Sequence, residues 1–94
     1  MRPIHAGAIL HDEFMKPSGI TANALSIALR VPPTRIHAIV NKKRSITPDT
    51  ALRLARYFNT SVEFWLTLQN SYDIETAKQH FSPEEIQPLQ PAMA

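Results

Sequence analysis

Two adjacent prolines, Pro32 and Pro33, constrain the fold of this chain more than any other feature of its sequence. A proline disfavours helical geometry at the residue before it, so residues 30–32 are expected to form a turn. Pro33 suits the first position of a helix, because the N–H that it lacks would have no partner there. The sequence therefore predicts two short helices, at about residues 22–29 and 33–41, joined by a tight turn.

The segment before the turn contains two candidate helices. The first is expected over residues 5–15, and the sequence Lys16–Gly19 should end it. Its apolar stripe consists of Ile9, Leu10 and Phe14. Thr21 is a good N-cap for the second helix. The residues of this second helix that are expected to face the core are Leu25, Ala28 and Leu29.

The segment after the turn contains two more candidate helices and a tail. Thr47 is a candidate cap for a fourth helix, with Pro48 at its first position and Asp49 near its positive end. Thr60 or Ser61 would cap a fifth, strongly apolar helix. The predicted fold class is therefore all-α, with a five-helix domain over residues 1–80. A short proline-containing tail over residues 81–94 is expected to form little beyond a turn of helix.

Composition excludes several classes of protein. The chain has 94 residues, 44% of them hydrophobic, and only two glycines, which is typical of one folded, helix-rich domain. It has no cysteine, so disulfides and thiolate metal sites are excluded. No apolar run approaches the ~18 residues of a membrane span, and no signal peptide is visible. We therefore expect a cytoplasmic protein that does not cross a membrane.

Enzyme chemistry also finds no support in the sequence. The four histidines lie on different segments, at spacings that form no metal pair such as i, i+4. The chain has no glycine-rich phosphate loop, no cysteine nucleophile and no paired carboxylates placed in a plausible cleft. We therefore expect no catalytic residue, no metal, no cofactor and no enzyme activity.

The charges are distributed unevenly along the chain, although the net charge is only +2. Residues 30–56 contain seven cations and one anion, a net charge of +6. Residues 62–94 contain five anions and one cation, a net charge of −4. A basic middle segment indicates a polyanionic partner, and the alternative is an ordinary solvated surface.

Two short helices joined by a tight turn are typical of a helix-turn-helix, whose second helix presents its N-terminal residues to base edges in the major groove. On the helix at 33–41, an inner face of Ile36, Ile39 and Val40 can pack on the domain, while small polar residues point outward. A basic run follows where the phosphate backbone should lie. The candidate DNA contacts of this segment are Thr34, Arg35, His37, Ala38, Asn41, Lys42, Lys43 and Arg44.

This interpretation has one alternative, and one feature of the turn departs from it. The segment could instead be a solvent-exposed helix of a bundle that binds no ligand. In addition, the turn of a helix-turn-helix often carries a left-handed glycine, and Arg30 stands near that place here.

From about Ile4 to Lys78 the chain resembles a lambda-repressor-like (Cro/C1-type, XRE) domain, and more specifically the HigA antitoxins of bacterial type II toxin–antitoxin modules. The motifs that carry the resemblance are VPPTRIHAIVNKKRSIT, DTALRLARYF and TSVEFWLTLQNSYD. The resemblance implies a homodimer that binds a palindromic, double-stranded operator and represses its own operon. It also implies a partner toxin, small, basic and RelE/HigB-like, that cleaves mRNA and is neutralised by the antitoxin.

The resemblance also implies where the operator is contacted. The residues at the family's groove-facing positions are Pro33, Thr34, Arg35, His37 and Ala38. At the start of the preceding helix, Thr21 and Asn23 are expected near a phosphate. Many relatives carry a second arginine in place of Thr34 and a glycine in place of Lys42. The preferred DNA sequence therefore does not follow from the resemblance.

The fifth helix is apolar on two sides. Trp65 and Gln69 lie on one side, and Phe64 and Leu68 lie well round toward the other. A helix of this kind needs two surfaces to pack on, the domain's own core and a second subunit. We expect a homodimer whose interface includes Phe64, Leu68 and Tyr72, with the two recognition helices ~34 Å apart on DNA. The alternative is a helix wholly buried in its own core.

Where a toxin would bind is left open between two surfaces. About fourteen residues follow His80, too few to wrap a toxin. The first helix, with His11, Asp12 and Glu13 exposed, is one candidate, and the acidic end of the chain is the other. Two further functions stay open at this point: a stand-alone dimeric repressor without a toxin, and a helical interaction module that has lost DNA binding.

Overall fold

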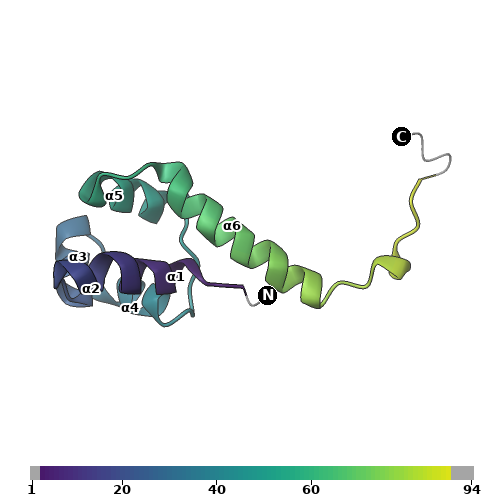
Figure 1. The fold of residues 1–94 in the computed structure, drawn as a ribbon, viewed down its shortest axis with the longest axis horizontal. Helices are drawn as coiled ribbons and strands as arrows, with labels where there is room; N and C mark the ends of the chain where they lie inside the picture. Colours follow the sequence, from purple (N-terminus) through teal and green to yellow (C-terminus); the bar gives the residue numbers. More distant parts are fainter. Residues whose placement is uncertain (1–2, 90–94) are drawn as a thin grey trace.

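A computed structural model describes residues 3–89, and this part of the chain contains helices but no strand (Figure 1). One continuous helical segment is formed by α1 (Ala6–Ile9), η1 (Leu10–Met15) and α2 (Lys16–Ser18). It is followed by α3 (Ala22–Leu29), α4 (Pro33–Val40), α5 (Pro48–Phe58) and α6 (Val62–Gln79). The predicted all-α fold with five main helices is confirmed.

The first helical segment is longer than predicted. It was expected to end at Met15, but it continues through Lys16–Ser18 and ends at Gly19, whose φ is +69°. The reason is a π-helical stretch at η1, where the N–H of Lys16 donates to the carbonyl oxygen of His11, five residues back. Pro17 has no N–H to donate, and it is tolerated in the first turn of α2 that follows the wider π turns.

The core lies between the first helical segment, α3, α4, α5 and α6. Trp65 of α6 is fully buried, and its ring centroid lies 4.8 Å from that of Phe14 and 5.0 Å from that of Phe64. Its indole N–H donates to the hydroxyl of Thr60 at 2.7 Å. Of the two cap candidates, Thr60 thus binds the indole, and Ser61 caps α6. The hydroxyl of Ser61 accepts from the N–H of Phe64 at 3.0 Å.

The first helical segment crosses α4 at Gly7. A Cβ at this glycine would lie 1.9 Å from the carbonyl oxygen of Ile39, so no larger residue fits without moving a backbone. Just before it, His5 caps α1: its Nδ1 accepts from the N–H of Gly7 at 2.8 Å. This close approach fixes the position of α4 relative to α1.

Two predicted inner faces need correction. Ala28 was expected in the core, but it is exposed, and Ser26 is buried on α3 together with Leu25 and Leu29. The hydroxyl of Ser26 donates to the carbonyl oxygen of Asn23 at 2.6 Å, which satisfies its buried polar group. In the first helical segment the buried hydrophobic residues are Ala6, Leu10 and Met15, while Ile9 and Phe14 are half-buried. The wider π turns rotate the inner face away from a regular 3.6-residue stripe.

The molecule is elongated, with extents of 55 × 23 × 21 Å. Figure 1 shows why: the C-terminal half of α6 leaves the helical body, and the tail continues beyond it. The described part of the tail forms a single 3₁₀ turn, Pro83–Glu85, in line with the expected turn of helix, while residues 90–94 lie outside the described residues. No helix within residues 3–89 is long and apolar enough to cross a membrane.

Candidate nucleic-acid interface

The turn between α3 and α4 has the geometry that the prolines predict. Arg30 adopts a left-handed conformation with φ +59° and donates its N–H to the carbonyl oxygen of Ile27 at 3.2 Å. The N–H of Val31 donates to the carbonyl oxygen of Ser26 at 3.0 Å, which completes a Schellman cap. Pro32 is extended and α4 begins at Pro33. Arginine thus occupies the left-handed position at which glycine is common.

The inner and outer faces of α4 are also as predicted. Ile36 and Ile39 are fully buried, and Val40 is half-buried against the core. On the opposite face, Thr34, His37 and Asn41 are exposed and Ala38 is half-buried. The helix therefore presents small and polar side chains to solvent from a rigidly packed base.

The start of α3 lies next to this exposed face. The hydroxyl of Thr21 caps α3 by accepting from the N–H of Ala24 at 3.1 Å. The side-chain oxygen of Asn23 lies 3.3 Å from Nε2 of His37 on α4. Two residues predicted as DNA contacts from separate helices, Asn23 and His37, are thus brought together on one exposed surface.

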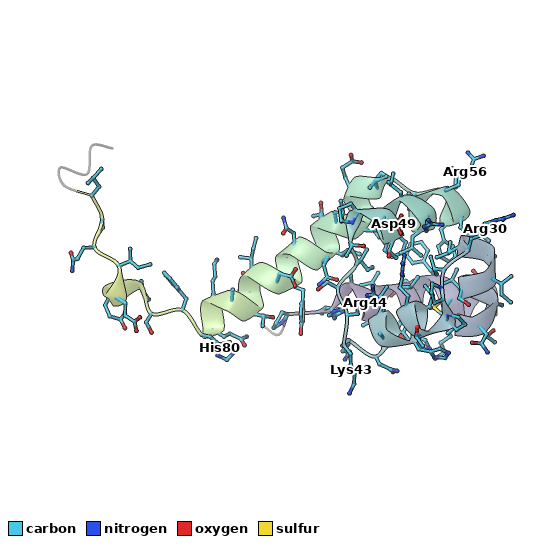
Figure 2. All side chains as sticks on the ribbon, turned by 180° about the vertical axis from the view of Figure 1, so that it is seen from behind. Arg30, Lys43, Arg44, Asp49, Arg56 and His80 are labelled. Atoms are coloured by element: carbon cyan, nitrogen blue, oxygen red, sulfur yellow. The ribbon has the colours of Figure 1, made fainter. Side chains whose placement is uncertain are left out.

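The loop after α4 carries the basic run. Lys42 has φ +64°, and its N–H donates to the carbonyl oxygen of Ile39 at 3.0 Å, while the N–H of Lys43 donates to that of Ala38 at 2.8 Å. Lys42 therefore stands where a helix cap favours glycine, and the chain turns sharply after α4. Within residues 3–89, none of the three loop cations forms an ion pair with a carboxylate. Figure 2 shows Lys43 extending away from the helices, so its ammonium group is accessible to an anion.

A buried hydrogen bond between a backbone N–H and a glutamine side chain holds the C-terminal end of this loop. The N–H of Ile46 donates at 2.9 Å to Oε1 of Gln69, a residue of α6 that is only 4% exposed. Nε2 of Gln69 donates in turn to Asp73 at 3.0 Å. The sequence placed Gln69 on the inner side of its helix but gave no sign of its partner in the loop.

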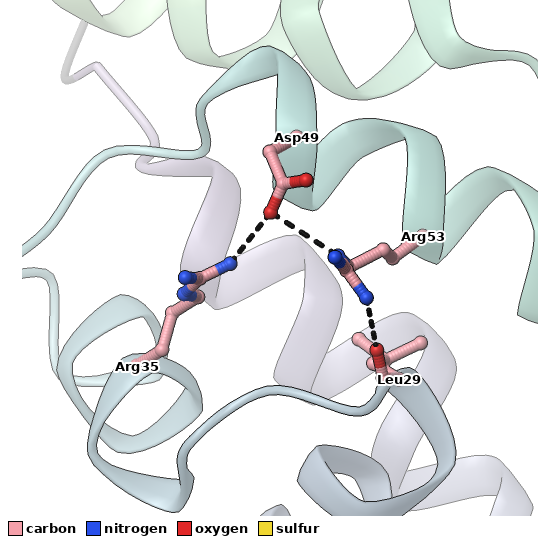
Figure 3. Close-up of polar contacts among 4 residues, drawn as sticks. All are labelled: Leu29, Arg35, Asp49 and Arg53. Carbon is pink, nitrogen blue, oxygen red and sulfur yellow. Dashed lines mark hydrogen bonds and ion pairs between the residues drawn. The ribbon is translucent and has the colours of Figure 1, made fainter.

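Arg35 has a partner that the sequence did not predict. Its Nη1 donates to Oδ2 of Asp49, at the start of α5, at 2.7 Å (Figure 3). Arg53 donates to the same oxygen through Nε at 3.1 Å, and its Nη1 donates to the carbonyl oxygen of Leu29 at 2.9 Å. The hydrogen bonds from Arg53 and Arg35 hold the pKa of Asp49 below its usual 3.8. The sequence had suggested only a favourable place for Asp49 near the positive end of α5.

The residues predicted for a dimer interface do not form a single exposed face. Phe64 is 38% exposed and lies against the rings of Phe14 and Trp65. Leu68 is half-buried and packs on the core. Tyr72 is half-buried, with its ring 4.8 Å from that of His5. Of the three, only Phe64 offers a large apolar surface to a partner.

Comparisons with known proteins agree with this geometry. A helix-turn-helix family model matches residues 13–65. Virulence-associated protein I of Dichelobacter nodosus is 51% identical over 79 residues, which cover 84% of this chain and 73% of that protein. The structure of an addiction module antidote protein of a HigA family from Coxiella burnetii is 48% identical, with a TM-score of 0.85, and covers 95% of this chain and 100% of that one. The chain belongs to the HigA family.

The structure of another HigA protein contains promoter DNA. Pseudomonas aeruginosa antitoxin HigA, in a structure with the higBA promoter, is 40% identical to this chain, with a TM-score of 0.89. The match covers 98% of this chain and 100% of that one. The resemblance to HigA antitoxins is therefore confirmed, and the family is one of helix-turn-helix regulators and antitoxins rather than of enzymes.

Proposed function

We propose that this protein is a DNA-binding antitoxin that binds an operator upstream of its own gene and represses its own operon. The observation that carries the proposal is the environment of α4, which begins at Pro33 and packs on the core through Ile36 and Ile39. The helix exposes polar side chains beside a basic loop whose cations form no ion pair in the described part of the chain. The promoter-bound structure of P. aeruginosa HigA, which has the same fold, supports it.

Contacts with the operator divide into two groups. The loop cations Lys42, Lys43 and Arg44 and the start of α3 hold phosphates, which positions the protein but carries no sequence information. The exposed face of α4 enters the major groove, where hydroxyl, imidazole, amide and guanidinium groups hydrogen-bond to base edges and Ala38 contacts a thymine methyl. Base reading is assigned to Thr34, Arg35, His37, Ala38 and Asn41.

This division is tested with Thr34→Ala and His37→Ala on the operator and on random DNA. If these side chains read bases, each variant should lose roughly 1–3 kcal/mol of affinity for the operator and almost none for random DNA. Arg56→Ala, an exposed cation at the far end of α5, is the control (Figure 2). Equal losses on both DNAs would reduce the two residues to backbone contacts.

We also infer that the protein binds DNA as a homodimer through α6, with Phe64 at the interface. Phe64 supports this inference, because it is an exposed aromatic side chain on α6 and aromatic residues are enriched in interfaces between protein chains. Light scattering of Phe64→Gln should show a lower dimer fraction than wild type. Ile74→Gln, which changes another exposed apolar residue of α6, is the matched control. A dimer that is equally stable in both variants would move the interface elsewhere.

The second half of the proposed function is neutralisation of a small, basic RelE/HigB-like toxin that cleaves mRNA. Its support is the family and the acidic C-terminal third, whose net charge from residue 62 onward is −4. His11, Asp12 and Glu13 of the first helical segment are exposed and offer the other candidate surface.

Co-expression with the short reading frame beside the gene tests this half. A neighbour that is toxic alone and co-purifies with the tagged protein would establish the antitoxin role. A harmless neighbour that does not bind would leave a stand-alone dimeric repressor.

A further inference from the structure

Asp49 lies where three helices of the DNA-binding unit meet. One of its carboxylate oxygens accepts from Arg35 on α4 at 2.7 Å and from Arg53 on its own helix at 3.1 Å. Arg53 then reaches the last carbonyl of α3, at Leu29, at 2.9 Å. Figure 3 shows the chain of contacts, which links the end of α3, the flank of α4 and the start of α5.

The way in which the Arg35 side chain is held connects this cluster to DNA recognition. The side chain is 24% exposed, and among the residues that the structure describes its buried Nε has no hydrogen-bond partner. The orientation of the guanidinium is therefore set by packing and by the hydrogen bond from Nη1 to Asp49. Because a guanidinium is planar with its donors in a fixed fork, anchoring one nitrogen fixes the directions of the others.

We propose that Asp49 is a positioning residue for operator recognition, which holds the guanidinium of Arg35 in the orientation that reads DNA. This inference rests on the proposed function of α4. Asp49 itself need not touch DNA, and Arg53 supports it by binding the same carboxylate oxygen.

A purely electrostatic role predicts the opposite result. A carboxylate near a DNA-binding surface repels phosphates, so its removal should tighten binding to every DNA alike. If Asp49 positions Arg35, its removal should instead weaken operator binding relative to random DNA. The ratio of the two affinities therefore separates the two roles, since a general charge effect cancels from it.

The experiment compares Asp49→Ala, Asp49→Asn and wild type on operator and random duplexes at one salt concentration. We expect the operator-to-random ratio to fall about tenfold in Asp49→Ala and by less in Asp49→Asn, which can still accept a hydrogen bond. Random DNA should bind as in wild type or more tightly. Leu52→Ala, which truncates another exposed side chain of α5, should leave the ratio unchanged.

The Arg35→Ala background tests whether Asp49 acts through Arg35. There, adding Asp49→Ala should change the ratio less than twofold, because the group that it positions is gone. Circular dichroism at the assay temperature verifies that each variant is folded. An unchanged ratio in the folded single variant, or an equal fall in the Arg35→Ala background, would overturn the inference. A wild-type protein that does not discriminate between the two DNAs would overturn the proposed function as well.

Discussion

For Gly7→Ala, helix propensity predicts a gain in stability, whereas the packing seen in the structure predicts a loss. Alanine replaces glycine in a helix with a gain of about 0.5–1 kcal/mol, so propensity alone predicts a more stable protein. The new Cβ, however, would lie 1.9 Å from the carbonyl oxygen and 2.7 Å from the carbonyl carbon of Ile39. Since such contacts need at least 3.0 Å, α1 and α4 must separate by about 1 Å. Overpacking of this kind costs about 1–3 kcal/mol.

Thermal unfolding followed by circular dichroism measures the net effect. Because the obstructing atoms are backbone and cannot rotate away, the cost lies in the upper part of that range, at about 2–3 kcal/mol, and subtracting the propensity gain leaves a net loss of about 1–2.5 kcal/mol. A loss of 1 kcal/mol lowers the Tm of a domain of this size by about 4–8 °C, so we expect a fall of about 5–20 °C. Ala24→Gly, at an exposed position of α3, calibrates the propensity difference in the same protein. Because the displaced carbonyl belongs to α4, operator affinity should fall too. A Gly7→Ala protein as stable as wild type would refute the close packing of α1 on α4.

Three further predictions concern the loop after α4 and the first helix cap. Replacing Lys42, Lys43 and Arg44 with alanine should reduce the slope of log affinity against log salt by up to about 2.7, and an unchanged slope would remove them from the interface. Gln69→Leu leaves a buried loop amide without its acceptor, so chemical denaturation should show a loss of about 1–3 kcal/mol, whereas the exposed Gln79→Leu should be neutral. Burial lowers the pKa of His5 from its usual 6.5, so the unfolded chain binds more protons there and stability should fall as pH drops below 6.5. That fall should be smaller in His5→Asn, which keeps a capping side chain; the same pH profile in both proteins would contradict the assignment.

The parts of the fold that sequence patterns predicted are those that depend on local chemistry. The turn at 30–32 follows from the two prolines, because proline restricts the backbone of its neighbours wherever it occurs. The buried face of α4, Ile36 and Ile39, follows from helical periodicity. The same periodicity failed in the first helical segment, where π-helical turns change the number of residues per turn.

The contacts that sequence patterns did not predict join residues far apart in the chain. Arg35 and Asp49 are 14 residues apart and meet only because α4 and α5 pack against each other. Gln69 and Ile46 are 23 residues apart, and a buried glutamine carries no periodic signal of its partner. The i, i+4 spacing of Asp49 and Arg53 is visible in the sequence and indicates a helical ion pair. It does not show that the pair also reaches Leu29 and Arg35.

Footprinting on the DNA upstream of the gene is the most direct test of the central claim, that α4 reads an operator in this protein's own promoter. Hydroxyl-radical cleavage should show two protected blocks related by two-fold symmetry, with centres about one helical turn apart, because each subunit places one recognition helix in the major groove. The protection should weaken in Thr34→Ala and His37→Ala at a protein concentration that saturates wild type. Uniform protection without discrete blocks, or the same footprint in these variants, would contradict the account.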